Sequence, residues 1–250
     1  KFLGREHSVA EALKALEKIR SAFSRVSIDL IYALPNQSEK DWRNILREAI
    51  SLGLPHMSLY QLTIEAGTVF YSRQRRGEVM ALEDDRAVDL YITTQELAHT
   101  AGFSAYEVSN HAKTGEECHH NLTYWKSGDW LGIGPGSHGR FAKAKNDSDN
   151  IVRHSTMSIR SPAKWLHSVK TTNHGIKSHK IESSLDWASE IIMMGLRLKE
   201  GINLDETEQL CGPIGRWLDS SGLKIAIDSG WLVHNNNDTR LKTTFEGRLR

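Results

Sequence analysis

The chain has 250 residues with 32 basic and 31 acidic side chains, and this formal net charge of +1 gives no electrostatic reason to expect a nucleic-acid partner. Its 39% hydrophobic and 25% charged residues are typical of one large or two small globular domains, and no apolar run approaches the roughly 20 residues that span a bilayer. Because it has two cysteines, Cys118 and Cys211, a disulfide framework is excluded, and we expect a reducing, cytoplasmic setting.

The first 65 residues alternate between helical and strand patterns. A capping box at Ser8–Glu11 precedes apolar residues at helical spacing up to about residue 22. The apolar run 26–34 predicts a strand buried on both faces, and residues 57–65 predict the next strand. Between them a helix begins at Ser38 and ends at Gly53. Its predicted buried stripe consists of Trp42, Ile45, Leu46, Ala49 and Ile50. This order of elements predicts a parallel sheet in an α/β fold.

The middle of the chain is less regular. Residues 84–101 predict a helix and residues 105–109 a short strand. Residues 110–140 lack clear periodicity, and a loop of that length inside a domain is usually functional. The polar segment 143–150 predicts an exposed excursion.

The last third changes character. A short helix is expected to begin at Pro162, an amphipathic helix at 185–198, and two further short helices within 204–222. Residues 224–243 predict a hairpin with residues 235–237 at its turn. We therefore divide the chain into an α/β domain (1–140), a linker (141–160) and a small helical domain with a β wing (161–250).

The segment 120–125 combines an imidazole, an amide and two amphipathic aromatic rings, contributed by His120, Asn121, Tyr124 and Trp125. Such a set suits a flat, partly charged ligand such as heme, whose iron takes one neutral imidazole as axial ligand. The alternative is that His120 only hydrogen-bonds the loop. The glycines that follow, Gly132, Gly134, Gly136 and Gly139, could bind an anion through backbone N–H groups or simply form a turn.

Two charged residues allow alternative interpretations. Asp29 lies within the apolar run 26–34, where an ionised carboxylate needs either a polar ligand or a neighbouring Arg or Lys. Arg5 lacks sequence context, and its spacing alone indicates a surface cation. Neither residue decides a function by itself.

Several motifs occur together and in order: Asp29–Ser38, Ser58–Thr68, Tyr106–Asn110, His120–Gly139, Met194–Leu198 and Phe245–Leu249. As a set they closely resemble the radical-SAM heme chaperone family HemW, which is similar to oxygen-independent coproporphyrinogen III oxidases. The resemblance covers nearly the whole chain. It implies the C-terminal part of a partial (β/α)6 radical-SAM barrel followed by a small helical and winged domain.

The resemblance also implies cofactors and site residues. In the intact protein, S-adenosylmethionine and a 4Fe-4S cluster would lie at the barrel mouth, and Arg5, Asp29, Thr63 and His138 match positions lining the S-adenosylmethionine site. His120, Asn121, Tyr124 and Trp125 match the family's HNxxYW motif, which implies heme binding with His120 as the iron ligand. The implied partners are heme or another porphyrin and recipient hemoproteins of the respiratory chain. The expected location is cytoplasmic, with peripheral contact to the inner membrane as a further expectation.

One departure from the family pattern limits what this chain can do alone. The family holds its cluster with a C-x3-C-x2-C motif near the N-terminus, and neither this motif nor the glycine motif after it occurs here. The chain also begins at Lys1 and not at Met, so we expect a fragment lacking the cluster-binding part and unable to cleave S-adenosylmethionine. We predict no catalytic residue in it. The expected function is heme delivery; oxidative decarboxylation of coproporphyrinogen III and an inert, aggregation-prone product are the alternatives.

Overall fold

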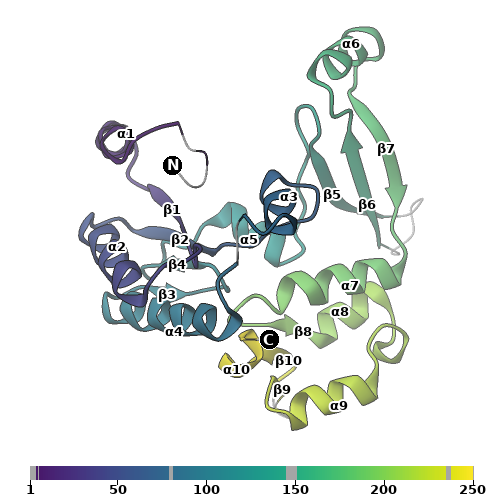
Figure 1. The fold of residues 1–250 in the computed structure, drawn as a ribbon. Coiled ribbons are helices and arrows are strands. Elements are labelled where there is room, and N and C mark those ends of the chain that lie inside the picture. The colour runs from purple at the N-terminus through teal and green to yellow at the C-terminus, as the bar shows by residue number, and fades with distance from the viewer. Residues whose placement is uncertain (1–3, 5, 79–80, 145–150, 235–237, 250) are drawn as a thin grey trace. The chain divides into compact units, whose positions relative to one another are not determined.

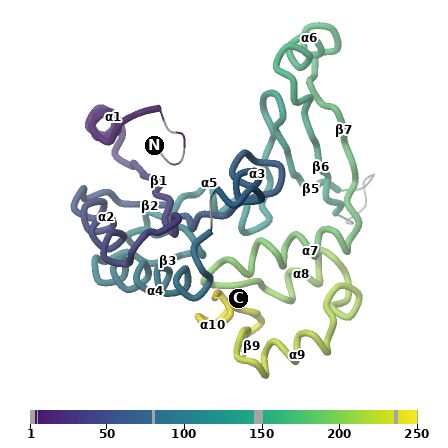
Figure 2. Tube along the Cα trace, viewed as in Figure 1, coloured from purple at the N-terminus to yellow at the C-terminus, as the bar shows by residue number. Residues whose placement is uncertain are grey.

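The computed structural model describes residue 4 and residues 6–78, 81–144, 151–234 and 238–249. The chain divides into two compact units, Lys1–Cys118 (unit 1) and His119–Arg250 (unit 2), each described by itself below. Figure 1 labels their elements, and Figure 2 follows the same chain as a tube.

Unit 1 contains four helices and one sheet within its described residues. In chain order the elements are α1 (Val9–Ala22), β1 (Ser27–Tyr32), α2 (Glu39–Ser51), β2 (His56–Gln61), α3 (Val69–Arg75), α4 (Asp84–Thr100), β3 (Ser104–Ala105) and β4 (Asn110–Ala112). The predicted first helix, the helices near 38–53 and 84–101, and the strands near 26–34 and 57–65 are confirmed, whereas α3 was not predicted.

The core of unit 1 forms where α2 and α4 pack beside the sheet (Figure 1). Ser38 caps α2 by accepting a hydrogen bond from the backbone N–H of Asp41, and the apolar residues of the helix form the face that it buries. On that face Trp42 stacks on Tyr32 of β1 at 4.9 Å between ring centroids, and its indole N–H donates to Thr94 of α4 at 2.8 Å. One buried tryptophan thus joins α2 to the sheet and to α4.

The sheet of unit 1 has the strand order β1-β2-β4-β3. Strands β1 and β2 are parallel, as predicted, but β4 pairs antiparallel with both β2 and β3, so the sheet is mixed. Because β1 lies at the sheet edge, Ser27 and Asp29 are exposed on it. The prediction of a strand buried on both faces is therefore wrong.

The buried stripe of α2 is also narrower than predicted. Trp42, Leu46 and Ala49 are buried and Ile50 is partly buried against the core, but the side chain of Ile45 is 42% exposed. The helix packs through the residues at positions i, i+4 and i+7, which are Trp42, Leu46 and Ala49, and the side chain of Ile45 lies beside this row.

Unit 2 contains two three-stranded sheets and several short helices among its described residues. They are α5 (His119–Trp125), β5 (His138–Ala144), β6 (Ile151–Ser158), α6 (Pro162–Thr172), β7 (Ile176–Ile181), α7 (Ser184–Gly195), β8 (Ile202–Asn203), α8 (Leu204–Cys211), the 3-10 turn η1 (Ile214–Arg216), α9 (Ser220–Asp228), β9 (Leu232–His234), β10 (Arg240–Thr243) and α10 (Phe245–Arg248).

Strands β5, β6 and β7 form one antiparallel sheet in that order, and α6 lies at its far end between β6 and β7 (Figure 1). The segment 143–150 was predicted to be an exposed excursion. Its first two residues, Lys143 and Ala144, belong to β5, and residues 145–150 lie outside the described residues. Strands β5 and β6 also occupy most of the predicted linker 141–160. In β5 and β6 polar side chains alternate with less polar ones along each strand. The segment is therefore rich in polar residues, which is why it was predicted to be a linker.

The C-terminal elements follow the prediction in part. The helices at 162 and 185–198 are confirmed as α6 and α7, and α8 and α9 lie near the two predicted short helices. Strands β9 and β10 pair antiparallel, as the hairpin prediction requires, although residues 224–228 belong to α9 and the turn residues 235–237 are outside the described part. The division into three domains stays a prediction.

Candidate functional site

The predicted ligand-binding segment 120–125 forms the short helix α5 at the start of unit 2. His120 is exposed, and Tyr124 lies one helical turn further on, so their side chains share one face of α5. The two rings meet edge to face, with 4.8 Å between centroids and 85° between planes. The imidazole is thereby oriented by a neighbouring ring while remaining accessible to solvent.

Trp130 extends this row of rings, which we call the aromatic row: His120, Tyr124 and Trp130. The centroids of Tyr124 and Trp130 lie 4.6 Å apart. Trp130 is fixed through its backbone, which exchanges two hydrogen bonds with Arg140 of β5, and through its indole N–H, which donates to the carbonyl of His138 at 3.0 Å. The sequence prediction missed Trp130, whose only signal was a further tryptophan in the aperiodic segment.

Arg153 supports the aromatic row from β6 and was also missed. Its side chain is 1% exposed and pairs with Asp129 at 2.7 Å, while it donates to the carbonyl of Gly128 at 2.8 Å. Its guanidinium carbon lies 5.6 Å from the ring centroid of Trp130 and equally far from that of Trp187. Burial lowers the pKa of Arg153, whereas Glu190 and Asp129 raise it, so nearby carboxylates help to retain its charge.

The loop after Trp130 exposes apolar side chains. Leu131 and Ile133 are 75% and 85% exposed. Between them Gly132 passes so close to the backbone of His138 that a Cβ atom would lie 2.6 Å from its carbonyl carbon, and Gly134 has φ of +98°. Close packing and turn geometry therefore account for these two glycines, which favours the turn alternative over the anion-binding one.

Trp125 faces a different part of unit 2. The guanidinium carbon of Arg197 lies 4.5 Å from its ring centroid. Its indole N–H is buried and has no hydrogen-bond partner within the described part of the chain. Asn121, the remaining motif residue, is half-buried on the same helix. The four motif residues thus share α5, with His120 accessible and Trp125 packed.

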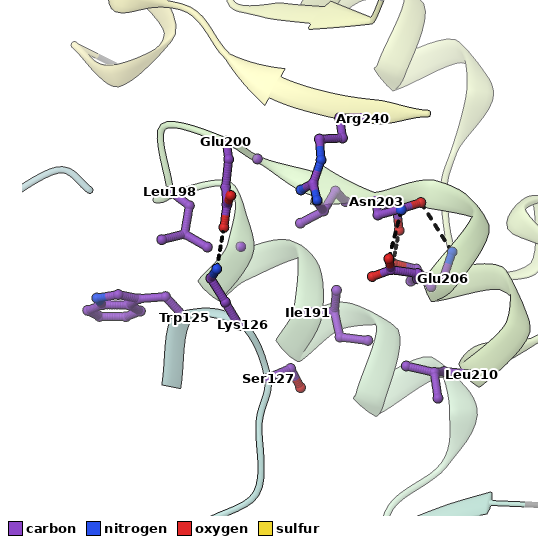
Figure 3. Close-up of a pocket in the computed structure, with 14 residues that line it drawn as sticks. Trp125, Lys126, Ser127, Ile191, Leu198, Glu200, Asn203, Glu206, Leu210 and Arg240 are labelled. Atoms are coloured by element: carbon purple, nitrogen blue, oxygen red, sulfur yellow. Dashed lines mark hydrogen bonds and ion pairs between the residues drawn. The ribbon is translucent and has the colours of Figure 1, made fainter. Parts of the chain in front are cut away.

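A cavity of about 270 Å³ lies beside Trp125 (Figure 3). Arg240 points into it, the ion pair of Lys126 and Glu200 (2.8 Å) stands at one side, and Asn203 donates to Glu206 at 2.9 Å on the other. Pockets that enclose drug-sized ligands measure roughly 300–1,000 Å³. This cavity is therefore too small to enclose a porphyrin, and the macrocycle would have to lie outside it.

The sequence of this chain is similar to those of known proteins over most of its length. No protein-family model matches the chain. The mitochondrial radical S-adenosyl methionine domain-containing protein 1 of Mus musculus is 35% identical over 86% of this chain and 49% of that protein. The protein called heme chaperone HemW in Haemophilus influenzae is 33% identical over 99% of this chain and 60% of its own length. The resemblance to the HemW family is confirmed.

The HemW resemblance has a structural counterpart. The fold is similar to that of coproporphyrinogen III oxidase (HemN) from Escherichia coli, with a TM-score of 0.70 at 15% identity over 98% of this chain and 57% of that one. At this identity the match establishes the α/β fold alone. The chain spans about half the length of the mouse relative and about three fifths of the bacterial HemW, so the activity of those whole proteins is a matter for proposal.

Three of the four residues that the HemW resemblance assigned to S-adenosylmethionine are described. Asp29 is exposed on β1 three residues before the strand ends, and no described residue forms an ion pair with it, so its expected burial is wrong. Thr63 is exposed two residues beyond the end of β2, and His138 is exposed at the start of β5. Asp29 and Thr63 belong to unit 1 and His138 to unit 2, so their meeting at one ligand stays a prediction. Arg5 lies outside the described residues.

The cysteines of this HemW-related chain do not form a cluster site. Cys118 is half-buried in unit 1 and Cys211 is buried in unit 2, where burial raises the pKa of its thiol to about 11. Within the described residues no group of three or more His, Cys, Asp or Glu side chains is placed to hold a metal ion. The donor set therefore does not fit a 4Fe-4S cluster.

Among the described helices, none combines the length and the apolar character that a membrane-spanning segment needs.

Proposed function

We propose that this chain binds heme at α5 and is the heme-holding part of a heme chaperone. The proposal rests on one observation above all: the HNxxYW segment forms a helix whose imidazole, that of His120, is exposed and held edge to face against Tyr124. The relatives named heme chaperone HemW support it from sequence. Heme is the cargo in this proposal and not a resident cofactor.

The residues around His120 fit heme in three respects. A neutral imidazole supplies the axial ligand for iron, and Tyr124 restricts its rotation. The exposed side chains of Leu131 and Ile133 offer apolar surface to the macrocycle, at about 25 cal/mol for each Å² removed from water. Trp125, whose ring packs against Arg197 and whose indole N–H is buried, anchors α5 within unit 2 and so holds His120 in position.

A heme titration tests the proposal. The absorbance of ferric heme near the Soret band is followed as the chain is added, for the wild type, His120→Ala and His119→Ala. His119 is exposed and adjacent on the same helix, so it is the matched control. We expect His120→Ala to weaken binding by about tenfold or more and His119→Ala to leave it unchanged, since loss of an iron ligand costs at least about 1.4 kcal/mol. Equal binding by all three proteins would remove His120 from the role.

The wider role is proposed from the family. In the intact protein we infer a partial (β/α)6 barrel to which unit 1 contributes, with Arg5, Asp29, Thr63 and His138 contacting S-adenosylmethionine. A 4Fe-4S cluster would need thiolates from outside this chain, and no step here depends on it. The recipients would be respiratory hemoproteins, in the cytoplasm or peripherally at the inner membrane. The animal relatives are named as mitochondrial.

A second candidate function is suggested by the structural match to coproporphyrinogen III oxidase. An oxidase site recognises a metal-free tetrapyrrole and its carboxylates, whereas a chaperone site that uses an imidazole recognises iron. Titration with metal-free coproporphyrin III separates the two. Binding as tight as that of heme, and equal in wild type and His120→Ala, would favour the oxidase function.

A further inference from the structure

Two imidazoles lie together on one face of the β5-β6-β7 sheet, away from α5 in sequence. Nδ1 of His154 on β6 and Nε2 of His179 on β7 are 2.8 Å apart. The register pairs His179 with Thr156 and His154 with Ile181, so the two histidines are diagonal neighbours whose side chains leave the same face. This arrangement depends on the register of β6 and β7, two antiparallel strands of the same sheet.

Phe141 of β5 orients the pair. It lies directly opposite His154 in the sheet, and their rings stack with 5.0 Å between centroids and 10° between planes. The rings of His154 and His179 are also stacked, at 5.0 Å and 30°. Three rings from three strands therefore hold each other, which reduces the entropy lost when a ligand fixes the imidazoles.

We propose that His154 and His179 form a two-histidine site for a divalent transition-metal cation of the Cu²⁺ or Ni²⁺ type. Two imidazole nitrogens bound at about 2.0 Å and about 90° to each other lie about 2.8 Å apart, which is the cis arrangement of a square-planar complex. Tetrahedral coordination would need about 3.3 Å at the same bond length. The two rings hold the separation of 2.8 Å by a hydrogen bond, and this separation is closer to the square-planar cis spacing than to the tetrahedral one, so a square-planar cation with water completing its coordination would need the smaller rearrangement.

The protonation of the pair is compatible with binding. Desolvation, followed by the nearby charges of His179 and Lys143, lowers the pKa of His154 and favours its neutral form. In neutral rings, moving the shared proton to the other nitrogen of its own ring frees both facing lone pairs, so no proton has to leave the protein. Lys143 lies on the same face as Phe141 and repels a cation, which weakens the site without blocking it.

Copper titration of the untagged 250-residue chain tests the site. Electron paramagnetic resonance of added Cu²⁺ is compared for wild type, His154→Gln, His179→Gln and His167→Gln, where His167 is an exposed histidine on α6 and serves as the control. We expect one tight equivalent with hyperfine coupling to two imidazole nitrogens. Each variant of the pair should lose it and bind about tenfold or more weakly, because the second ligand no longer binds intramolecularly. The control should match wild type.

Two further results decide the outcome. Lys143→Gln should tighten binding, since it removes a like charge and no ligand. The double variant of His154 and His179 should bind more weakly than either single variant but by less than the sum of the two single effects, because either single change already abolishes the chelate. Circular dichroism confirms that the variants fold; His179 is exposed, so its variant is the safer of the two. Identical copper isotherms and spectra in wild type and a folded His179→Gln would overturn the proposal.

Discussion

The guanidinium of Arg153 is a buried charge whose partners come from the segment that precedes β5. Asp129 and the carbonyl of Gly128 accept its hydrogen bonds, and two tryptophan rings flank it. We predict that Arg153→Ala lowers the free energy of unfolding of unit 2 by about 3 kcal/mol, through lost packing and an orphaned carbonyl. Arg160→Ala, at an exposed position beside the same sheet, should change it by less than about 0.5 kcal/mol. Urea denaturation followed by tryptophan fluorescence measures both, and equal effects would contradict the buried contact.

His111 of β4 makes the stability of unit 1 depend on pH. Burial lowers its pKa to about 4 from an unfolded value of 6.5. The unfolded chain therefore binds more protons between these values, and stability falls as the pH falls from about 6.5 to about 4, by at most about 3 kcal/mol. Burial also lowers the pKa of His56, which adds to the same trend.

The contribution of His111 is measured from the slope of the free energy of unfolding against pH. Denaturation at a series of pH values should give a weaker dependence between pH 6.5 and 4 for His111→Gln than for wild type. His99→Gln, at an exposed position on α4, should keep the wild-type slope. A His111→Gln profile parallel to the wild-type one would show that other groups cause the loss.

At the scale of single elements, α2 shows how packing selects among neighbouring apolar residues. Leu46 is fully buried, whereas Ile45 is 42% exposed. Leu46→Ala should cost about 3 kcal/mol because it leaves a cavity in the core, and Ile45→Ala should cost less than about 1 kcal/mol. Chemical denaturation of the two variants provides the measurement. Similar costs would mean that α2 is rotated relative to the position described above.

The length and regularity of an element decided whether it could be predicted from the sequence. Helices with side-chain caps and regular apolar spacing, such as α2, were found with ends near the observed ones. The strand predicted at 105–109 is wrong, because β3 ends at Ala105 and β4 begins at Asn110. These strands have two and three residues, too few for a periodicity to emerge, and the antiparallel pairing of β4 with β2 depends on contacts distant in sequence. The hairpin of β5 and β6 was missed because its outward polar residues resemble a loop.

The candidate site was predictable to a similar degree. The four motif residues were found from the sequence, but residues 110–140 were interpreted as an aperiodic loop, so the helix α5 that places His120 beside Tyr124 was not predicted. Trp130 and Arg153 could not be placed, since the first reaches Tyr124 by a turn and the second comes from β6. The burial of Asp29 was predicted wrongly because an apolar run does not reveal whether its strand lies at a sheet edge.

For the molecule as a whole, the proposed heme binding is supported by the sequence similarity to proteins named heme chaperone HemW, whereas the structural match establishes the fold alone. The fold is similar to that of a coproporphyrinogen III oxidase, yet this chain has two cysteines, fewer than the thiolates that a 4Fe-4S cluster takes. The motif in α5, by contrast, is complete and presents its imidazole to solvent. The central claim is therefore that His120 is the axial ligand of a bound heme.

Low-temperature electron paramagnetic resonance of the ferric heme complex tests this claim most directly. With the wild type we predict the signal of heme iron ligated by imidazole, retained in His119→Ala. With His120→Ala that signal should disappear, and added free imidazole should restore it. An unchanged imidazole-ligated spectrum in His120→Ala would place the iron on another residue and contradict the account.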